Sequence, residues 1–230
     1  MSDPLAVYER LAERLSNTPN GFPRSKSGTE LKLLAKMFTP EQAALAAVMH
    51  LQRESAADIA AHAGVDAEAA YGTLKDMTRR GLIYAGRGEG GLTFGLLPFV
   101  VGSFEESLPY MDAEMAQLYE ALVQETRAVG LLDQRPAFHR VIPVEQSIKA
   151  EIEVLPYERA SELLDSARSF AVRECICRKQ KALIGEPCQH SRMNCITFSL
   201  SEGAYDNVPH ARSISREEAS RILRGANSYR

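Results

Sequence analysis

The chain has 230 residues, of which 45% are hydrophobic and 25% charged, and its formal net charge is −3. These values are typical of globular proteins that are large enough to bury a core without disulfide staples. The first residues, MSDPLAVYERLAERL, lack the apolar run of a secretory signal, and the most apolar stretch, GLTFGLLPFVVG, is about half as long as a membrane-spanning helix. We therefore expect a cytoplasmic protein without a membrane-spanning segment.

The first part of the chain predicts a helical arm followed by a linker. Residues 4–16 have apolar side chains at spacings near three and four, which is typical of an amphipathic helix. The turn-rich segment NTPNGFPRSKSG follows. We assign residues 1–27 to this arm and linker, and we expect a short helix over 29–37 to begin the next domain.

Residues 28–103 predict a winged helix. A helix over 40–52 begins with a capping box made by Thr39 and Gln42. Two more helices follow. The first is capped by Ser55 with Asp58 and ends at Gly64, and the second is capped by Asp66 and ends at Gly81. Two short strands, 82–84 and 92–94, flank GRGEGG, which we interpret as the turn of the wing rather than as a nucleotide-binding loop.

Residues 104–230 predict a small mixed α/β domain with a Cys-rich metal-binding loop, so that the whole chain is α+β. A long helix is expected over 112–129, extended structure over 139–156, and a second helix over 157–167. The segment SFAVRECIC is typical of a strand, and the Cys-rich loop follows it. A final helix begins at a capping box that runs from Ser215 to Glu218.

All four cysteines of the chain lie in one short segment, as Cys175, Cys177, Cys188 and Cys195. If ECIC is extended, Cys175 and Cys177 face the same side, while Ile176 faces the core. Four thiolates from one segment are the ligand set of an iron–sulfur cluster or of a structural zinc ion. A thiol redox switch without metal is the third interpretation.

The charges around the cysteines favour a cluster over zinc. Residues 168–230 hold eleven Lys and Arg against six Asp and Glu. Cations stabilise the negative charge of a cluster held by thiolates, and five of them flank these cysteines: Arg173, Arg178, Lys179, Lys181 and Arg192. Zinc sites more often have cysteine pairs two to four residues apart, which this segment lacks. His190 is a weaker candidate ligand than any of the four thiols.

The predicted winged helix has poor chemistry for reading DNA. The start of its third helix, which would enter the major groove, carries Asp66 and Glu68 among alanines. Residues 28–100 hold seven Lys and Arg against eight Asp and Glu, so the domain lacks the positive charge of a DNA-binding module. Lys75, Arg79, Arg80 and Arg87 could contact phosphates without specifying a sequence. DNA binding is therefore disfavoured, and we expect a module for protein contacts or packing.

Several phrases together resemble a family of 4Fe-4S ferredoxin-type proteins with an N-terminal winged-helix-like region. They are LLPFVVGSFE, RVIPVEQSI, VLPYERASELL and CICRKQKALIGEPCQH…NC, within a similarity that runs from about residue 30 to residue 224. The resemblance implies that Cys175, Cys177, Cys188 and Cys195 participate in binding the cluster. Longer members continue into a Cys-rich ferredoxin module with C-x-x-C-x-x-C runs, which this sequence lacks; it resembles either a shortened form or a single-cluster member.

The sequence therefore predicts an iron–sulfur protein for one-electron transfer or redox sensing. Its expected cofactor is a 4Fe-4S cluster, with zinc as the alternative, and its expected partner is a redox protein with an acidic docking surface. A homo-oligomer is compatible with the sequence. No nucleophile motif is present, so we expect no catalysis by the chain alone but a role as the electron-transfer component of an oxidoreductase system. The competing functions are a metal- or redox-responsive winged-helix regulator and a structural zinc-binding interaction module.

Overall fold

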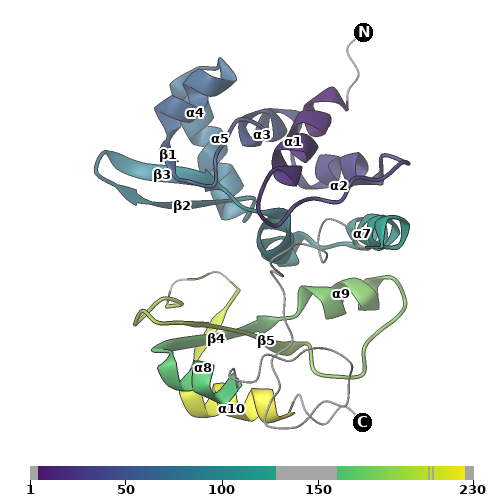
Figure 1. The fold of residues 1–230 in the computed structure, drawn as a ribbon, viewed down its shortest axis with the longest axis vertical. Helices are drawn as coiled ribbons and strands as arrows, with labels where there is room; N and C mark the ends of the chain where they lie inside the picture. Colours follow the sequence, from purple (N-terminus) through teal and green to yellow (C-terminus); the bar gives the residue numbers. More distant parts are fainter. Residues whose placement is uncertain (1–4, 128–159, 207, 209, 226–230) are drawn as a thin grey trace. The chain divides into compact units, whose positions relative to one another are not determined.

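The computed structural model describes residues 5–127, 160–206, 208 and 210–225, and it has an α+β fold (Figure 1). The chain divides into two compact units, Met1–Phe138 and His139–Arg230. The sequence analysis placed the boundary between the winged helix and the cysteine domain at 103/104. The difference arises because the helix that follows packs against the first unit. The extended segment predicted over 139–156 lies outside the described residues.

The first unit contains every element that was predicted for a winged helix, in the predicted order. Its helices and strands are α1 (Ala6–Ser16), α2 (Thr29–Met37), α3 (Pro40–Ala46), β1 (Glu54–Ser55), α4 (Ala56–Ala63), α5 (Ala67–Arg79), β2 (Ile83–Gly88) and β3 (Gly91–Leu96). The three strands form an antiparallel sheet in the order β1-β3-β2. Gly88 pairs with Gly91, so the predicted wing turn is confirmed.

Local capping signals set most of these helix ends. Thr39 and Gln42 form the predicted capping box of α3, and Ser55 accepts a hydrogen bond from the amide of Asp58. Asp66 caps α5, and Gly64 ends α4 in the left-handed conformation that favours glycine. The prediction that α3 extends to residue 52 is wrong. It ends at Ala46, and the carbonyl oxygen of Met49 instead accepts a 2.6 Å hydrogen bond from Arg14 Nε.

The N-terminal arm is part of the first unit's core rather than a separate appendage. Leu11 and Leu15 of α1 are buried, and the hydroxyl of Tyr8 donates a 3.1 Å hydrogen bond to the carbonyl of Phe38. The chain after the hairpin forms η1 (Phe99–Ser103), α6 (Phe104–Glu106), η2 (Leu108–Tyr110) and α7 (Ala113–Thr126). Helix α7 packs against α2, and Lys36 forms a 2.9 Å ion pair with Asp112 at the start of α7.

The second unit is a three-stranded antiparallel sheet with helices against one face. Its elements are α8 (Ala160–Ser166), β4 (Ser169–Glu174), α9 (Ile176–Leu183), β5 (Met193–Ser199), β6 (Arg212–Ile214) and α10 (Arg216–Gly225). Strand β4 is central, in the order β5-β4-β6. Helices α8 and α10 lie side by side, and Leu164, Phe170 and Ala219 are buried between them and the sheet (Figure 1). The predicted cap of the last helix is confirmed, since Ser215 Oγ accepts a hydrogen bond from the amide of Glu218.

Candidate functional site

The structure corrects the predicted conformation of the first two cysteines. Strand β4 ends at Glu174, Cys175 is the N-cap of α9, and Cys177 lies in the first turn of that helix. The pair is therefore not on an extended strand. Ile176 is buried, as predicted. The helix forms because RKQKAL consists of strong helix formers, and Gly185, with φ of +85°, follows its end.

Two strand pairings bring both ends of the Cys-rich segment to one end of the sheet. Cys195 lies in β5, directly opposite Arg173 of β4, and a bulge follows between Arg173 and Glu174. The backbone amide of Cys175 then donates a 2.7 Å hydrogen bond to the carbonyl of Arg192. Cys175, Cys177 and Cys195 therefore gather where β4 and β5 meet the start of α9. Cys188 lies in the connection between α9 and β5 and is exposed.

All four cysteines are free thiols, and the environment of Cys175 favours its thiolate. A hydrogen bond with the side chain of Cys177 is the main cause that lowers the pKa of Cys175 to about 5. Partial burial opposes this shift, whereas the backbone amides of Arg178 and Cys177 and the charge of Arg178 support it. A thiol with this pKa is ionised at neutral pH, which is the form that binds metals.

The basic residues around the cysteines have several partners. Arg192 forms a 3.2 Å ion pair with Glu174, and Lys181 forms a 2.9 Å ion pair with Glu186. The guanidinium of Arg178 donates a hydrogen bond to the carbonyl of Ser191. These contacts link α9 to the segment that follows it. Arg192 and Lys181 are therefore paired with carboxylates, and their positive charge is partly balanced before it acts on the thiolates.

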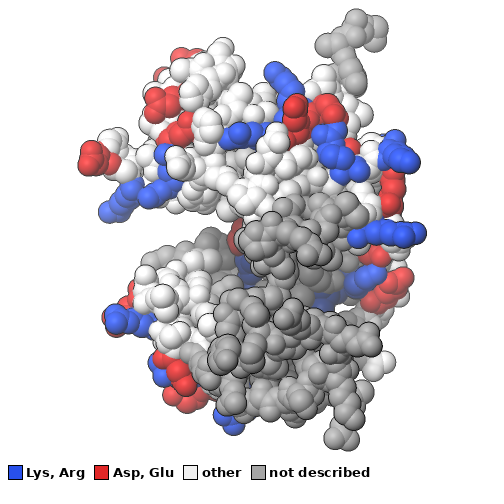
Figure 2. Space-filling model, viewed as in Figure 1, with Lys and Arg blue, Asp and Glu red and all other residues white. Residues whose placement is uncertain are grey.

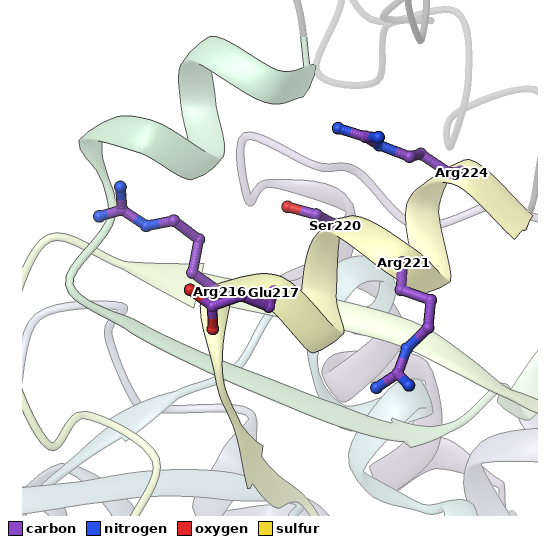
Figure 3. A pocket seen from close by; sticks show the side chains of 5 residues that line it. All are labelled: Arg216, Glu217, Ser220, Arg221 and Arg224. Atoms are coloured by element: carbon purple, nitrogen blue, oxygen red, sulfur yellow. The ribbon is translucent and has the colours of Figure 1, made fainter.

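A second basic surface of this unit lies along α10. A cavity of about 470 Å³ is lined, among the described residues, by Arg216, Glu217, Ser220, Arg221 and Arg224 (Figure 3). Arg216 is held by a 3.6 Å ion pair with Asp165 and by the carbonyl of Ala167. Arg221 and Arg224 are exposed and point to different sides of the helix in Figure 3. The helix therefore presents cations to solvent on more than one side.

Helix α5, the third helix of the predicted winged helix, has the acidic start that the sequence indicates. Asp66 caps α5 and accepts hydrogen bonds from the amides of Glu68 and Ala69, all on the exposed side of the helix. Lys75 lies 5.4 Å from the centre of the Tyr71 ring, near the middle of the helix. On the face shown in Figure 2, Lys and Arg side chains alternate with Asp and Glu over the described residues of this unit. This mixture differs from the basic stripe typical of DNA-binding surfaces.

Sequence reasoning missed another group of side chains whose donor atoms could hold a metal ion. His50, Glu54 and His62 each place one ligand atom within 4.8 Å of the others, and among the described residues they are the one group of three or more His, Cys, Asp or Glu that does so. The sequence analysis did not treat either histidine as a ligand. The signal is weak because Glu54 lies four positions after His50 and eight before His62, on different elements that the fold brings together.

A comparison with protein-family models, with curated proteins and with solved structures finds no match to this chain. The resemblance to ferredoxin-type proteins therefore stays a prediction. Among the helices that the structure describes, none is both long enough and apolar enough to cross a membrane.

Proposed function

We propose that this protein binds one iron–sulfur cluster through Cys175, Cys177, Cys188 and Cys195 and uses it for one-electron transfer or redox sensing. The observation that carries the proposal is the placement of Cys175, Cys177 and Cys195 where β4, β5 and the start of α9 meet, and the lowered pKa of the Cys175 thiol supports it. A 4Fe-4S cluster, when bound, would supply a centre that gains and loses one electron. Free thiols agree with a reducing cytoplasm, where we place the protein.

The donor set fits a cluster in kind. Four thiols come from one unit of the chain, and two of them, Cys177 and Cys188, are exposed and accessible to an incoming cluster.

The charge of the second unit supports docking to an acidic redox partner. Arg173, Arg178 and Lys179 lie beside the cysteines, and Arg221 and Arg224 of α10 add exposed cations. Nearby positive charge raises the affinity of a cluster for an electron, because it stabilises the more negative, reduced state. We assign the residues beside the cysteines to tuning the potential and to contacting the partner.

A comparison of two variants tests the ligand set. Cys177→Ser removes a proposed thiolate ligand, so its iron and sulfide content after anaerobic purification should fall by at least tenfold. His190→Ala, in the same segment, should keep the wild-type content. If Cys177→Ser retains all of its iron, or if His190→Ala loses it, this ligand set is wrong.

The winged-helix arrangement of the first unit supports one competing function, a metal-responsive DNA-binding regulator. The acidic start of α5 weighs against it, as does the mixed charge of the surrounding surface. The third alternative, a structural zinc module, uses the same cysteines and differs in containing no sulfide.

A further inference from the structure

A carboxylate in the first unit lies between two imidazoles. His50 Nδ1 is 2.9 Å from Glu54 Oε2, and His62 Nδ1 is 3.6 Å from Glu54 Oε1. The two rings are 6.0 Å apart between centroids and nearly perpendicular. Each oxygen of Glu54 therefore faces a different histidine, and one ligand atom from each residue falls within 4.8 Å of the other two.

The fold holds these donors on three different elements. His50 lies in the loop after α3, Glu54 begins β1, and His62 lies in the last turn of α4. Glu54 is opposite Phe94 in the β1–β3 pairing, and its Oε2 also accepts a 3.0 Å hydrogen bond from the amide of His50. The carbonyl of His50 accepts a 2.8 Å hydrogen bond from the amide of Leu96. The sheet thus fixes two of the three donors through their backbones.

Solvent can reach the imidazoles, whereas the carboxylate is held in place. The side chains of His50 and His62 are 54% and 47% exposed, but that of Glu54 is only 16% exposed. An ion can therefore approach from solvent toward a carboxylate that has little freedom to turn away.

The donor chemistry selects a class of metal. Two imidazole nitrogens and one carboxylate oxygen are ligands for zinc and similar divalent transition metals, whereas magnesium and calcium prefer all-oxygen sites. A tetrahedral zinc ion with bonds of about 2.0–2.1 Å separates its ligand atoms by about 3.3–3.4 Å. The nitrogen–oxygen distances, 2.9 Å from His50 Nδ1 to Oε2 and 3.6 Å from His62 Nδ1 to Oε1, involve different oxygens of Glu54, and both are close to this value.

We propose that His50, Glu54 and His62 bind one divalent transition-metal ion of the zinc class, with water completing its coordination. The ion joins the loop after α3, the first strand of the sheet and the end of α4. Because these elements surround the base of the hairpin, the bound ion stabilises the first unit. This site is independent of the four cysteines and needs no cluster.

Zinc titration of the full-length protein tests the proposal. Chelator-stripped, reduced protein is dialysed anaerobically against graded Zn²⁺, and bound zinc is counted per chain. Because thiolates also bind zinc, wild type is compared with His62→Ala and with Cys177→Ser. The His62→Ala variant should lose one equivalent of zinc or bind it at least tenfold more weakly. The Cys177→Ser variant should keep that equivalent, and His210→Ala, which removes an exposed histidine of the other unit, should bind as wild type does.

A second variant and a second probe guard against a variant that fails to fold. Glu54→Gln keeps a hydrogen-bond acceptor but removes the anionic ligand, and Glu68→Gln is its control at an exposed carboxylate. Co²⁺ bound at this site should give visible d–d absorption that persists in Cys177→Ser, and this remaining absorption should disappear when Glu54→Gln is added to Cys177→Ser. Zinc binding by His62→Ala and Glu54→Gln with wild-type stoichiometry and affinity would overturn the proposal, whatever the cysteines bind.

Discussion

The backbone amide of Cys175 donates a hydrogen bond of 2.7 Å to the carbonyl oxygen of Arg192. This bond closes the segment that carries Cys177 and Cys188, and it brings Cys175 near the strand that carries Cys195. Cysteines that are twenty positions apart in the sequence thus belong to one local structure. The proposed site depends on this backbone hydrogen bond more than on any single side chain.

The first prediction concerns the reactivity of Cys175 in metal-free, reduced protein. Its alkylation by iodoacetamide should increase with pH around a midpoint of about 5, because the hydrogen bond with Cys177 lowers the pKa of its thiol. In Cys177→Ala, which removes the hydrogen-bond donor, the midpoint should move upward, and in Cys188→Ala it should stay unchanged. Peptide mass spectrometry resolves the site. A wild-type midpoint near the ordinary thiol value of about 8.5 would contradict the described environment.

The same thiol should make the stability of the metal-free protein depend on pH. Because its pKa is lower in the folded state, at about 5, the stabilisation is complete above the unfolded pKa of about 8.5 and is lost as pH falls through about 5. Between these values the unfolded state binds more protons, so stability rises with pH. Urea midpoints measured across this window should rise less in Cys175→Ser than in wild type. Parallel curves for the two proteins would argue against the shift.

A buried amide in the first unit should contribute strongly to stability. Gln42 accepts a 2.8 Å hydrogen bond from Arg80 Nη1 and donates one of 2.9 Å to Asp76 Oδ2, in addition to its role in the capping box. Replacing it by leucine leaves these partners unpaired, so Gln42→Leu should lower the free energy of unfolding by about 1–3 kcal/mol. Urea denaturation measures this.

The matched control for this change is Gln124→Leu, at an exposed glutamine of α7 whose amide donates a hydrogen bond to Glu120. We expect it to change stability by less than about 0.5 kcal/mol, as surface substitutions usually do. Equal effects of the two variants would show that the bonds of Gln42 contribute little.

The first unit should not retain DNA. The start of α5 carries Asp66 and Glu68. Their negative charges would be repelled by the phosphates that line a DNA groove. In gel-shift assays at low salt, genomic fragments should stay unbound at micromolar protein, with or without metal. Retention that weakens steeply with salt would support the regulator instead, and Arg79→Gln and Arg87→Gln would then locate the contact.

The first unit was largely predictable because its signals are local. The capping box of Thr39 and Gln42, the cap at Asp66 and the stop at Gly64 each act within four residues, so the sequence reveals them directly. No local stop signal marks the early end of α3, and the carbonyl of Met49, three residues beyond it, accepts its hydrogen bond from Arg14, which is distant in the sequence.

The cysteine segment was predictable in composition but not in conformation. The β-forming run before Cys175 suggested that the strand continues, whereas the helix formers after it begin α9 one residue later. The strand that carries Cys195 also escaped prediction, since it forms only by pairing with β4. The same reason applies to the group formed by His50, Glu54 and His62. The loop, strand and helix that hold these residues come together only through tertiary structure, so the group could not be predicted from the sequence.

The most direct test of the central claim is an anaerobic purification in which iron, sulfide and zinc are quantified on one sample beside its visible spectrum. The account predicts about four irons and four sulfides per chain, as a 4Fe-4S cluster requires, with a broad brown absorption that bleaches on reduction. Zinc bound through the cysteines, without sulfide and without colour, would contradict it and make the cysteine site structural.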